Sequence, residues 1–114
     1  MALPSPIPEP LVELIAERFR LLSEPMRVRA LDYLRDQGES SVGELADALG
    51  SSQQNLSKHL GALHAAGIVG RRRDGNRVIY AIADETVLEI CDVVCGSLGR
   101  RAGEVSEMLE AVGS

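Results

Sequence analysis

Aromatic residues are scarce in this sequence, which has no tryptophan and only Phe19, Tyr33 and Tyr80 in 114 positions. Proteins that hold single-stranded nucleic acids stack the bases on aromatic side chains, so the scarcity argues against that class. Binding to a nucleic-acid duplex has no such requirement. With so few aromatic side chains, we expect the core to consist mainly of leucine, valine, isoleucine and alanine.

Cysteine is also scarce, because Cys91 and Cys95 are the only two and lie four positions apart. Neither their number nor their spacing is typical of a secreted disulfide framework, and a reducing cytoplasm is the expected location. The N-terminal stretch lacks the basic and apolar regions of a signal peptide. No apolar run is long enough to span a bilayer, so we expect no membrane partner.

Catalytic patterns are missing as well. The sequence shows no Ser-His-Asp arrangement and no glycine loop that would cradle a phosphate, so we expect no enzymatic activity.

Alternating prolines predict a flexible arm over residues 1–9. A 45% share of apolar residues supplies one modest core, and we expect a single folded domain over residues 10–112.

The charges that are present are unevenly distributed. The net charge is -5, which by itself disfavours a nucleic-acid partner. Residues 53–77, however, carry five positive side chains and one negative side chain, a local charge of +4, so the remainder carries -9. A basic face on an acidic body is consistent with steering toward DNA while non-specific affinity stays low.

The stretch from residue 53 to Gly67 predicts a helix with two different faces. Leu56, Leu60 and Leu63 follow one another at helical spacing and predict a core-facing stripe. The other face carries amides, one hydroxyl and one ammonium group, which are the groups that read base edges and bind phosphates in a major groove; they belong to Gln53, Gln54, Asn55, Ser57 and Lys58. A solvated surface helix explains this polar face about as well when the helix is considered alone.

Neighbouring signals favour DNA contact. Ser41 and Glu44 have the spacing of a capping box, and Gly50 ends the short helix that they begin. The run Ser51-Ser52-Gln53-Gln54 is a second capping-box-like start and places two short helices across a tight turn, as in a helix-turn-helix. Asp74-Gly75 between two β-capable runs then predicts a hairpin. Helices are predicted over 10–22 and 25–36, the second with Val28, Leu31 and Leu34 buried. The fold class is therefore mainly α with a small β-hairpin, a winged helix-turn-helix.

The last segment predicts a long helix that begins near Asp84. Apolar residues continue at helical spacing through Val87, Val94, Leu98 and Leu109. So small a body cannot bury all of them, so this segment and the first helix are predicted to form a two-fold dimer interface. Three glycines, at 96, 99 and 103, either permit close helix approach or divide the segment into two helices.

Several motifs occur in a fixed order: Leu22–Leu31, Glu44–Ala46, Ser52–Gln53, Leu56–Leu60, Ala66–Val69 and the Arg-Asp-Gly turn at 73–75. In that order they resemble the ArsR/SmtB family of winged-helix repressors over roughly residues 12–82. The resemblance implies a homodimer that binds a palindromic double-stranded DNA operator and leaves it when an inducer binds. The predicted DNA contacts are Ser52, Gln53, Gln54, Ser57, Lys58, His59, Arg71, Arg72, Arg73 and Arg77.

Two known inducer sites of the family do not match this chain. Arsenic-sensing members have a Cys-Val-Cys segment where Ser41, Val42 and Gly43 stand here. At the zinc-type site only Asp84 matches, because Thr86, Ser97 and Arg100 occupy the other positions, and one carboxylate is not a zinc site. His59 is accompanied only by His64 and is predicted to hydrogen-bond locally or to phosphate rather than to bind metal.

Cys91 and Cys95 are left as the candidate sensor. One alternative is that both are small apolar residues buried on the dimerisation helix. A second is that the two thiolates, which share one helical face, bind a thiophilic metal or metalloid ion with help from the second subunit. A third is that they are oxidised. If neither chemistry applies, the chain is a repressor that depends on a regulatory partner protein, or an interaction module without DNA binding.

Overall fold

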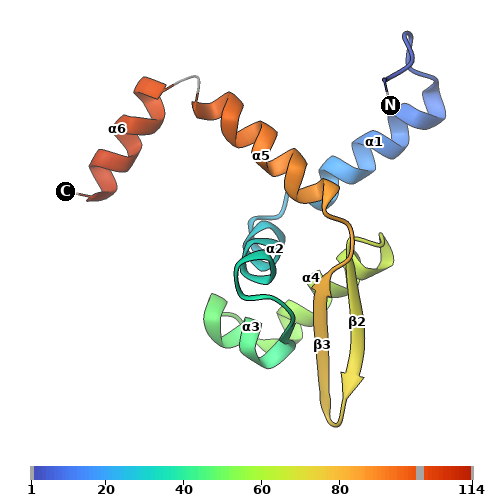
Figure 1. Ribbon diagram of the computed structural model, residues 1–114, viewed down its shortest axis with the longest axis vertical. Coiled ribbons are helices and arrows are strands. Elements are labelled where there is room, and N and C mark those ends of the chain that lie inside the picture. Colours follow the sequence, from blue (N-terminus) through green and yellow to red (C-terminus); the bar gives the residue numbers. More distant parts are fainter. Residues whose placement is uncertain (1, 100–101, 114) are drawn as a thin grey trace. The chain divides into compact units, whose positions relative to one another are not determined.

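The computed structural model describes residues 2–99 and 102–113. It divides into two compact units, residues 1–83 and residues 84–114. The first unit contains four helices and three strands, and the second contains helices α5 and α6 (Figure 1). No helix in the described part of the chain is long and apolar enough to cross a membrane.

Two proline-started helices open the first unit. Helix α1 spans Glu9–Leu21 and α2 spans Pro25–Gln37, each with proline in its first turn, where the missing amide proton costs nothing. Helix α1 buries none of its residues, and Leu14 and Phe19 are 67% and 52% exposed. The prediction for α2 was wrong at Val28, which is exposed, whereas Ala30, Leu31 and Leu34 are buried.

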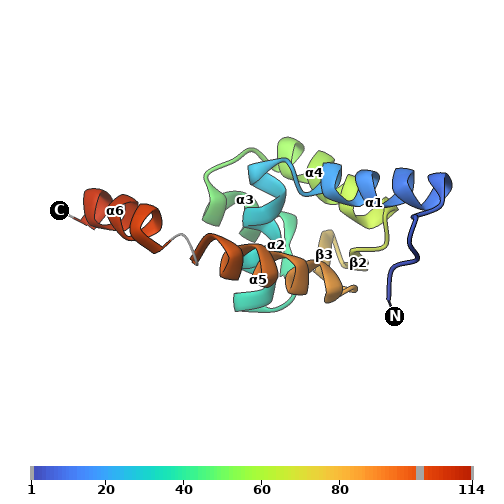
Figure 2. The same cartoon turned by 90° about the horizontal axis from the view of Figure 1, so that it is seen from above.

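The helix-turn-helix consists of α3 (Val42–Leu49) and α4 (Gln53–Ala65). The predicted capping box is present, because the Glu44 amide donates to the Ser41 hydroxyl at 3.1 Å and Glu44 accepts from the Ser41 amide at 3.3 Å. Gly50 ends α3 with a left-handed φ of 65°, a conformation that a side chain would strain. Figure 2 shows α2, α3 and α4 grouped together in the first unit.

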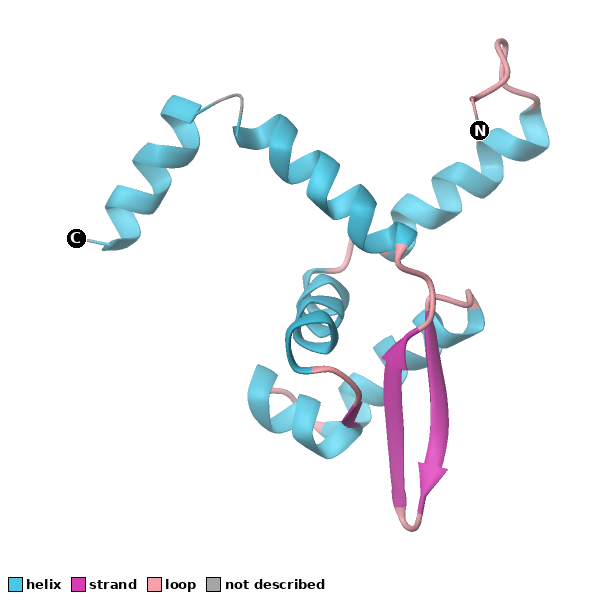
Figure 3. Cartoon of the chain, in the orientation of Figure 1, coloured by secondary structure: helices cyan, strands magenta, loops and turns pink. Residues whose placement is uncertain are grey.

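The wing is the hairpin of β2 (Val69–Asp74) and β3 (Arg77–Ile82). Asp74 pairs with Arg77, so the loop between the strands has two residues, and of these only Gly75 has a positive φ, as in a type II′ turn. A two-residue strand that was not predicted, β1 (Ser40–Ser41), pairs with β3 on its other side. Figure 3 shows these strands in magenta beside the helices.

The core of the first unit lies where α2, α3 and α4 meet the inner residues of the sheet. Its side chains are aliphatic apart from Tyr80, as the composition predicts. The largest fully buried residues of this unit are Leu31, Leu45, Leu56, Leu60, Leu63, Ile68 and Val69. Close packing of these side chains holds α4 by its leucine face, so its other face is left for solvent.

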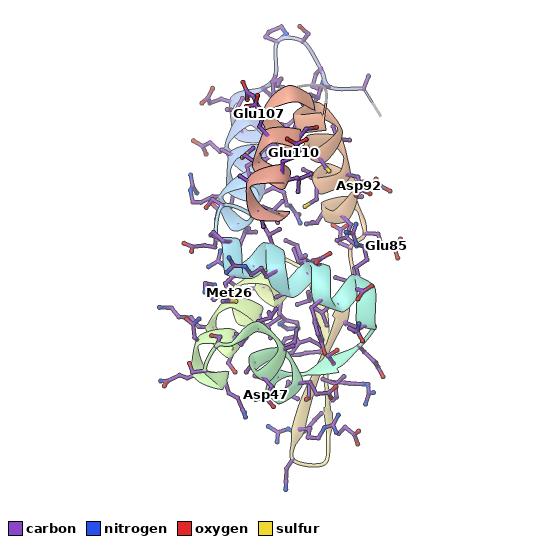
Figure 4. All side chains as sticks on the ribbon, turned by 90° about the vertical axis from the view of Figure 1, so that its left-hand side faces the viewer. Met26, Asp47, Glu85, Asp92, Glu107 and Glu110 are labelled. Atoms are coloured by element: carbon purple, nitrogen blue, oxygen red, sulfur yellow. The ribbon has the colours of Figure 1, made fainter. Side chains whose placement is uncertain are left out.

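The second unit contains two helices where the sequence predicts either one or two. Its described residues form two helices, α5 (Thr86–Gly99) and α6 (Ala102–Gly113), with Gly96 inside α5 and Gly103 inside α6. Val87 is fully buried, but Val94, Leu98 and Leu109 of the predicted stripe are exposed. The second unit also carries much of the negative charge, including Glu85, Asp92, Glu107 and Glu110 (Figure 4).

Candidate nucleic-acid interface

Helix α4 presents a polar face that its packing leaves uncovered. The hydroxyl of Ser52 accepts a hydrogen bond from the Asn55 amide at 3.1 Å and thereby caps the start of the helix. Asn55 is itself engaged locally, because its side-chain amide donates to the Ser51 hydroxyl at 3.0 Å. Of the five predicted contact residues inside α4, all except His59 are exposed: Gln53, Gln54, Ser57 and Lys58.

The four wing arginines, Arg71, Arg72, Arg73 and Arg77, are all exposed. Arg71 is paired with Tyr80 across the hairpin and Arg72 with Ile79. Because neighbouring residues of a strand project to opposite faces, Arg71 and Arg73 share one face of the wing and Arg72 lies on the other. The wing therefore presents guanidinium groups on both of its faces.

Two grooves lie between α4 and the wing. The first, of about 530 Å³, is lined by Ser57, three wing arginines, Val42, Val78 and Tyr80. The second, of about 360 Å³, is lined by Ser41, Val42, Gly43, Gln53, Ser57, Asn76, Arg77 and Val78. Val42, Ser57 and Val78 line both, so the two grooves adjoin, and Ser57 is the residue of α4 that they share. Six predicted contact residues are brought together here: Gln53, Ser57, Arg71, Arg72, Arg73 and Arg77.

Two wing arginines form ion pairs that sequence reasoning missed. Arg72 donates from Nη2 to Oε1 of Glu39 at 2.6 Å, and Arg77 donates from Nη2 to Oε1 of Glu44 at 3.1 Å. The hydrogen bond to Glu39, followed by the charge of that carboxylate, raises the pKa of the Arg72 guanidinium above its ordinary value. Each pair joins residues 33 positions apart, so no local pattern indicates it.

His59 occupies a different environment from its neighbour Lys58. It is half-buried, and its Nδ1 accepts a hydrogen bond from Nε of Arg27 at 3.1 Å. Nη1 of the same arginine donates to the Leu21 carbonyl oxygen at 3.4 Å. Arg27 of α2 therefore contacts both the end of α1 and helix α4. An acceptor at Nδ1 places the proton of a neutral imidazole on Nε2.

The candidate sensor residues lie on α5, where Cys91 is half-buried and Cys95 is exposed, and both are free thiols. At the zinc-type position, Asp84 serves as a helix cap, because its Oδ1 accepts from the Thr86 amide at 3.0 Å and from the Thr86 hydroxyl at 2.5 Å. Ser97 is exposed, and Arg100 lies outside the described residues. At the arsenic-type position, Ser41 and Val42 are buried and Ser41 belongs to the capping box.

A metal ion would need ligands beyond this pair of cysteines. Among residues 2–99 and 102–113, no group of three histidine, cysteine or acidic side chains is placed to hold one. Two thiolates supply half of a tetrahedral site, so an ion of that geometry at Cys91 and Cys95 requires ligands from a second chain or from solution.

Comparisons with known proteins decide the family. A model of a helix-turn-helix domain matches residues 22–72. The uncharacterized HTH-type transcriptional regulator Rv0081 of Mycobacterium tuberculosis is 43% identical over 103 residues, which cover 90% of each chain. Its crystal structure superposes with a TM-score of 0.74 at 42% identity and covers 85% of this chain and 97% of that one.

The chain belongs to the ArsR/SmtB family of winged helix-turn-helix transcriptional regulators. Two further structures support the fold. The AntR antimony-specific transcriptional repressor has a TM-score of 0.76 at 26% identity, over 86% of this chain and 88% of that one. The homodimeric winged helix-turn-helix DNA-binding domain of Mb0332 from Mycobacterium bovis, a possible ArsR-family regulator, has a TM-score of 0.70 at 32% identity, over 82% and 86%.

Membership of this ArsR/SmtB family confirms two sequence-based expectations. The fold is a mainly helical winged helix-turn-helix, and the relatives are regulators rather than enzymes. Because the family binds DNA through its helix-turn-helix, the grooves between α4 and the wing are the candidate interface of this regulator.

Proposed function

We propose that this protein is a repressor that binds a palindromic double-stranded DNA operator as a homodimer, through α4 and the wing. The observation that carries the proposal is the pair of grooves that meet at Ser57, because amide, hydroxyl and guanidinium donors from two elements converge there. These groups suit a duplex, in which base edges lie between two rows of phosphates. The cytoplasm is the compartment that such a regulator and its free thiols require.

Contacts divide by chemistry between the two elements. On α4, Gln53, Gln54 and Ser57 present amides and a hydroxyl for base edges in the major groove, and Lys58 presents an ammonium group for phosphate. The wing arginines contact phosphates or the adjacent minor groove. Ser52 and His59 complete the proposed contact set. The Ser52 side chain also caps α4, and the His59 side chain also accepts a hydrogen bond from Arg27.

The homodimer is proposed to form through α1 and α5. The support is that both helices expose large apolar side chains, among them Leu14 and Phe19 on α1 and Val93 and Leu98 on α5. Exposed apolar area of this kind marks an interaction surface. The Mb0332 domain, which shares this fold, is homodimeric. A dimer places two copies of α4 for successive half-sites of a palindrome.

The inducer is proposed to act at Cys91 and Cys95. In one form the two thiols lose their protons and bind a thiophilic metal or metalloid ion, and the antimony specificity of AntR, a structural relative, favours this form. In the other form an oxidant such as peroxide takes two electrons, the thiols release two protons and one S–S bond forms. The exposure of Cys95 makes either reagent able to reach the pair.

The deciding experiment is fluorescence anisotropy of the reduced protein on a labelled duplex from its own upstream region. A shuffled duplex of the same length and composition is the control. We expect tighter binding to the upstream duplex, at a stoichiometry of two chains per site. Equal, weak binding to both duplexes in low salt would instead identify an interaction module that has lost DNA recognition.

A further inference from the structure

Two carboxylates are positioned against the wing from different elements of the first unit. Glu39 lies in the turn before β1 and pairs with Arg72, and Glu44 lies in the first turn of α3 and pairs with Arg77. Arg72 lines the first groove and Arg77 lines the second. Each groove therefore has one arginine that is paired with an acidic side chain.

Both pairs are accessible to a competitor. The side chains of Arg72 and Glu39 are each 54% exposed, and those of Arg77 and Glu44 are 60% and 50% exposed. An exposed ion pair contributes little stability because water screens it and two long side chains must be ordered. A phosphate can therefore displace the carboxylate, and the displaced carboxylate stays beside the phosphate and repels it.

We propose that Glu39 and Glu44 limit the DNA affinity of this regulator by occupying Arg72 and Arg77 in the free protein. The inference rests on the proposed function, because it assigns two residues that act against the same interface. Non-specific binding is nearly all electrostatic, so a carboxylate that holds a phosphate-binding arginine lowers it directly. The wing keeps enough positive charge to attract DNA, and the protein dissociates readily from non-operator sequences.

If the same ion pairs had a scaffolding role, the expected change in DNA affinity would be the opposite. If the pairs served to hold the wing in its binding position, loss of a carboxylate would leave Arg72 or Arg77 misplaced and would weaken binding. The geometry favours competition, because backbone pairing of β3 with β1 already anchors the wing to the rest of the first unit. Backbone hydrogen bonds hold the hairpin without help from exposed side chains.

The test uses Glu39→Gln and Glu44→Gln in the full-length protein. Glutamine keeps the shape of the side chain, and at position 44 it also keeps the capping box, which accepts glutamine at this position. The control is Asp32→Asn, which removes the same charge from a surface pair with Arg35 on α2, at 3.2 Å. Thermal unfolding of each variant checks that the fold is retained.

Anisotropy is measured on the upstream duplex and on the shuffled duplex at several salt concentrations. We expect Glu39→Gln and Glu44→Gln each to bind the shuffled duplex roughly threefold to tenfold more tightly at low salt, with a smaller gain at high salt. Asp32→Asn should change the affinity by less than twofold, because its charge lies outside the wing pairs.

Three outcomes overturn the inference while the proposed function stands: unchanged affinity, weaker binding, or an equal gain in Asp32→Asn. The first shows that the pairs do not compete with phosphate, the second shows a scaffolding role, and the third shows an effect of net charge alone. If the wild-type protein binds neither duplex at low salt, the proposed function fails and the inference fails with it.

Discussion

Nε of Arg27 donates a hydrogen bond to Nδ1 of His59 at 3.1 Å, across 32 positions of sequence. The bond joins α2 to α4 on the helix that carries the predicted DNA contacts. His59 is itself a predicted DNA contact and follows another, the exposed Lys58, so Arg27 holds this part of the predicted contact surface. Arg27 is therefore a positioning residue for α4.

Replacement of Arg27 by alanine should weaken operator binding about tenfold and lower the free energy of unfolding by about 1 to 2 kcal/mol, because a half-buried charged hydrogen bond is lost. Anisotropy and urea unfolding measure the two effects. Nitrogen-15 NMR of the His59 ring adds a specific readout, since the variant should lose the fixed Nε2–H tautomer.

The control for this variant is Arg29→Ala, which removes an exposed arginine from the same helix. Arg29→Ala should leave the His59 resonances in place. An Arg27→Ala protein with wild-type operator affinity and an unchanged His59 tautomer would remove Arg27 from the positioning role.

Gln54→Ala tests direct reading of the sequence by α4. A side-chain amide that bonds a base edge discriminates by about 1 to 3 kcal/mol, and an exposed amide on solvent contributes nothing comparable. We expect the upstream duplex to lose affinity by that amount while the shuffled duplex loses little. Gln37→Ala is the control, because its amide bonds Asp36 at the end of α2. An equal loss on both duplexes would show that Gln54 only positions the protein.

Arg77→Ala tests the contact between wing and phosphate. Each phosphate that a protein neutralises adds about 0.9 to the slope of log K against log salt, so the variant should show a slope shallower by about that amount. The loss should be similar on both duplexes, because phosphates carry no sequence information. Arg35→Ala on α2 supplies the comparison, and a wild-type slope in Arg77→Ala would exclude Arg77 from the contacts.

Cys91→Ser separates the forms of the proposed sensor. If an ion is sensed, the variant should keep its affinity for DNA in the absence of metal and lose its release by a thiophilic ion. If an oxidant is sensed, peroxide should release the wild-type protein, dithiothreitol should restore binding, and the variant should stay bound. Ser97→Ala on the same helix is the control. Release of Cys91→Ser by either reagent, as in the wild type, would place the sensor elsewhere.

The features that sequence alone predicted are those with short-range causes. Ser41 and Glu44 bond within one helical turn, and Gly50 adopts its left-handed φ because of its own missing side chain. The hairpin turn was predicted at Asp74-Gly75 and lies one residue later, at Gly75-Asn76, because Gly75 supplies the positive φ and Asp74 pairs with Arg77. These local signals were sufficient to place α3, α4 and the wing.

Longer-range features could not be predicted in the same way. Nothing near Arg27 in the sequence indicates His59, and nothing near Glu39 indicates Arg72, because each contact depends on how distant elements pack. Strand β1 has only two residues, too few to show alternation, and exists because β3 offers it an edge. Val28 matched the helical period but lies at the margin of the buried face.

Ser41 is at once the last residue of β1, the cap of α3 and a pairing partner of Ile79 on β3. This one residue fastens the hairpin to the helix-turn-helix, so the spacing between the polar face of α4 and the wing is fixed before any duplex arrives. The protein then offers the duplex two contact elements at a fixed separation. DNA sequences that bend easily, or whose minor groove narrows easily, would fit that separation at a lower deformation energy. Base steps that no side chain contacts would therefore still affect the choice of operator.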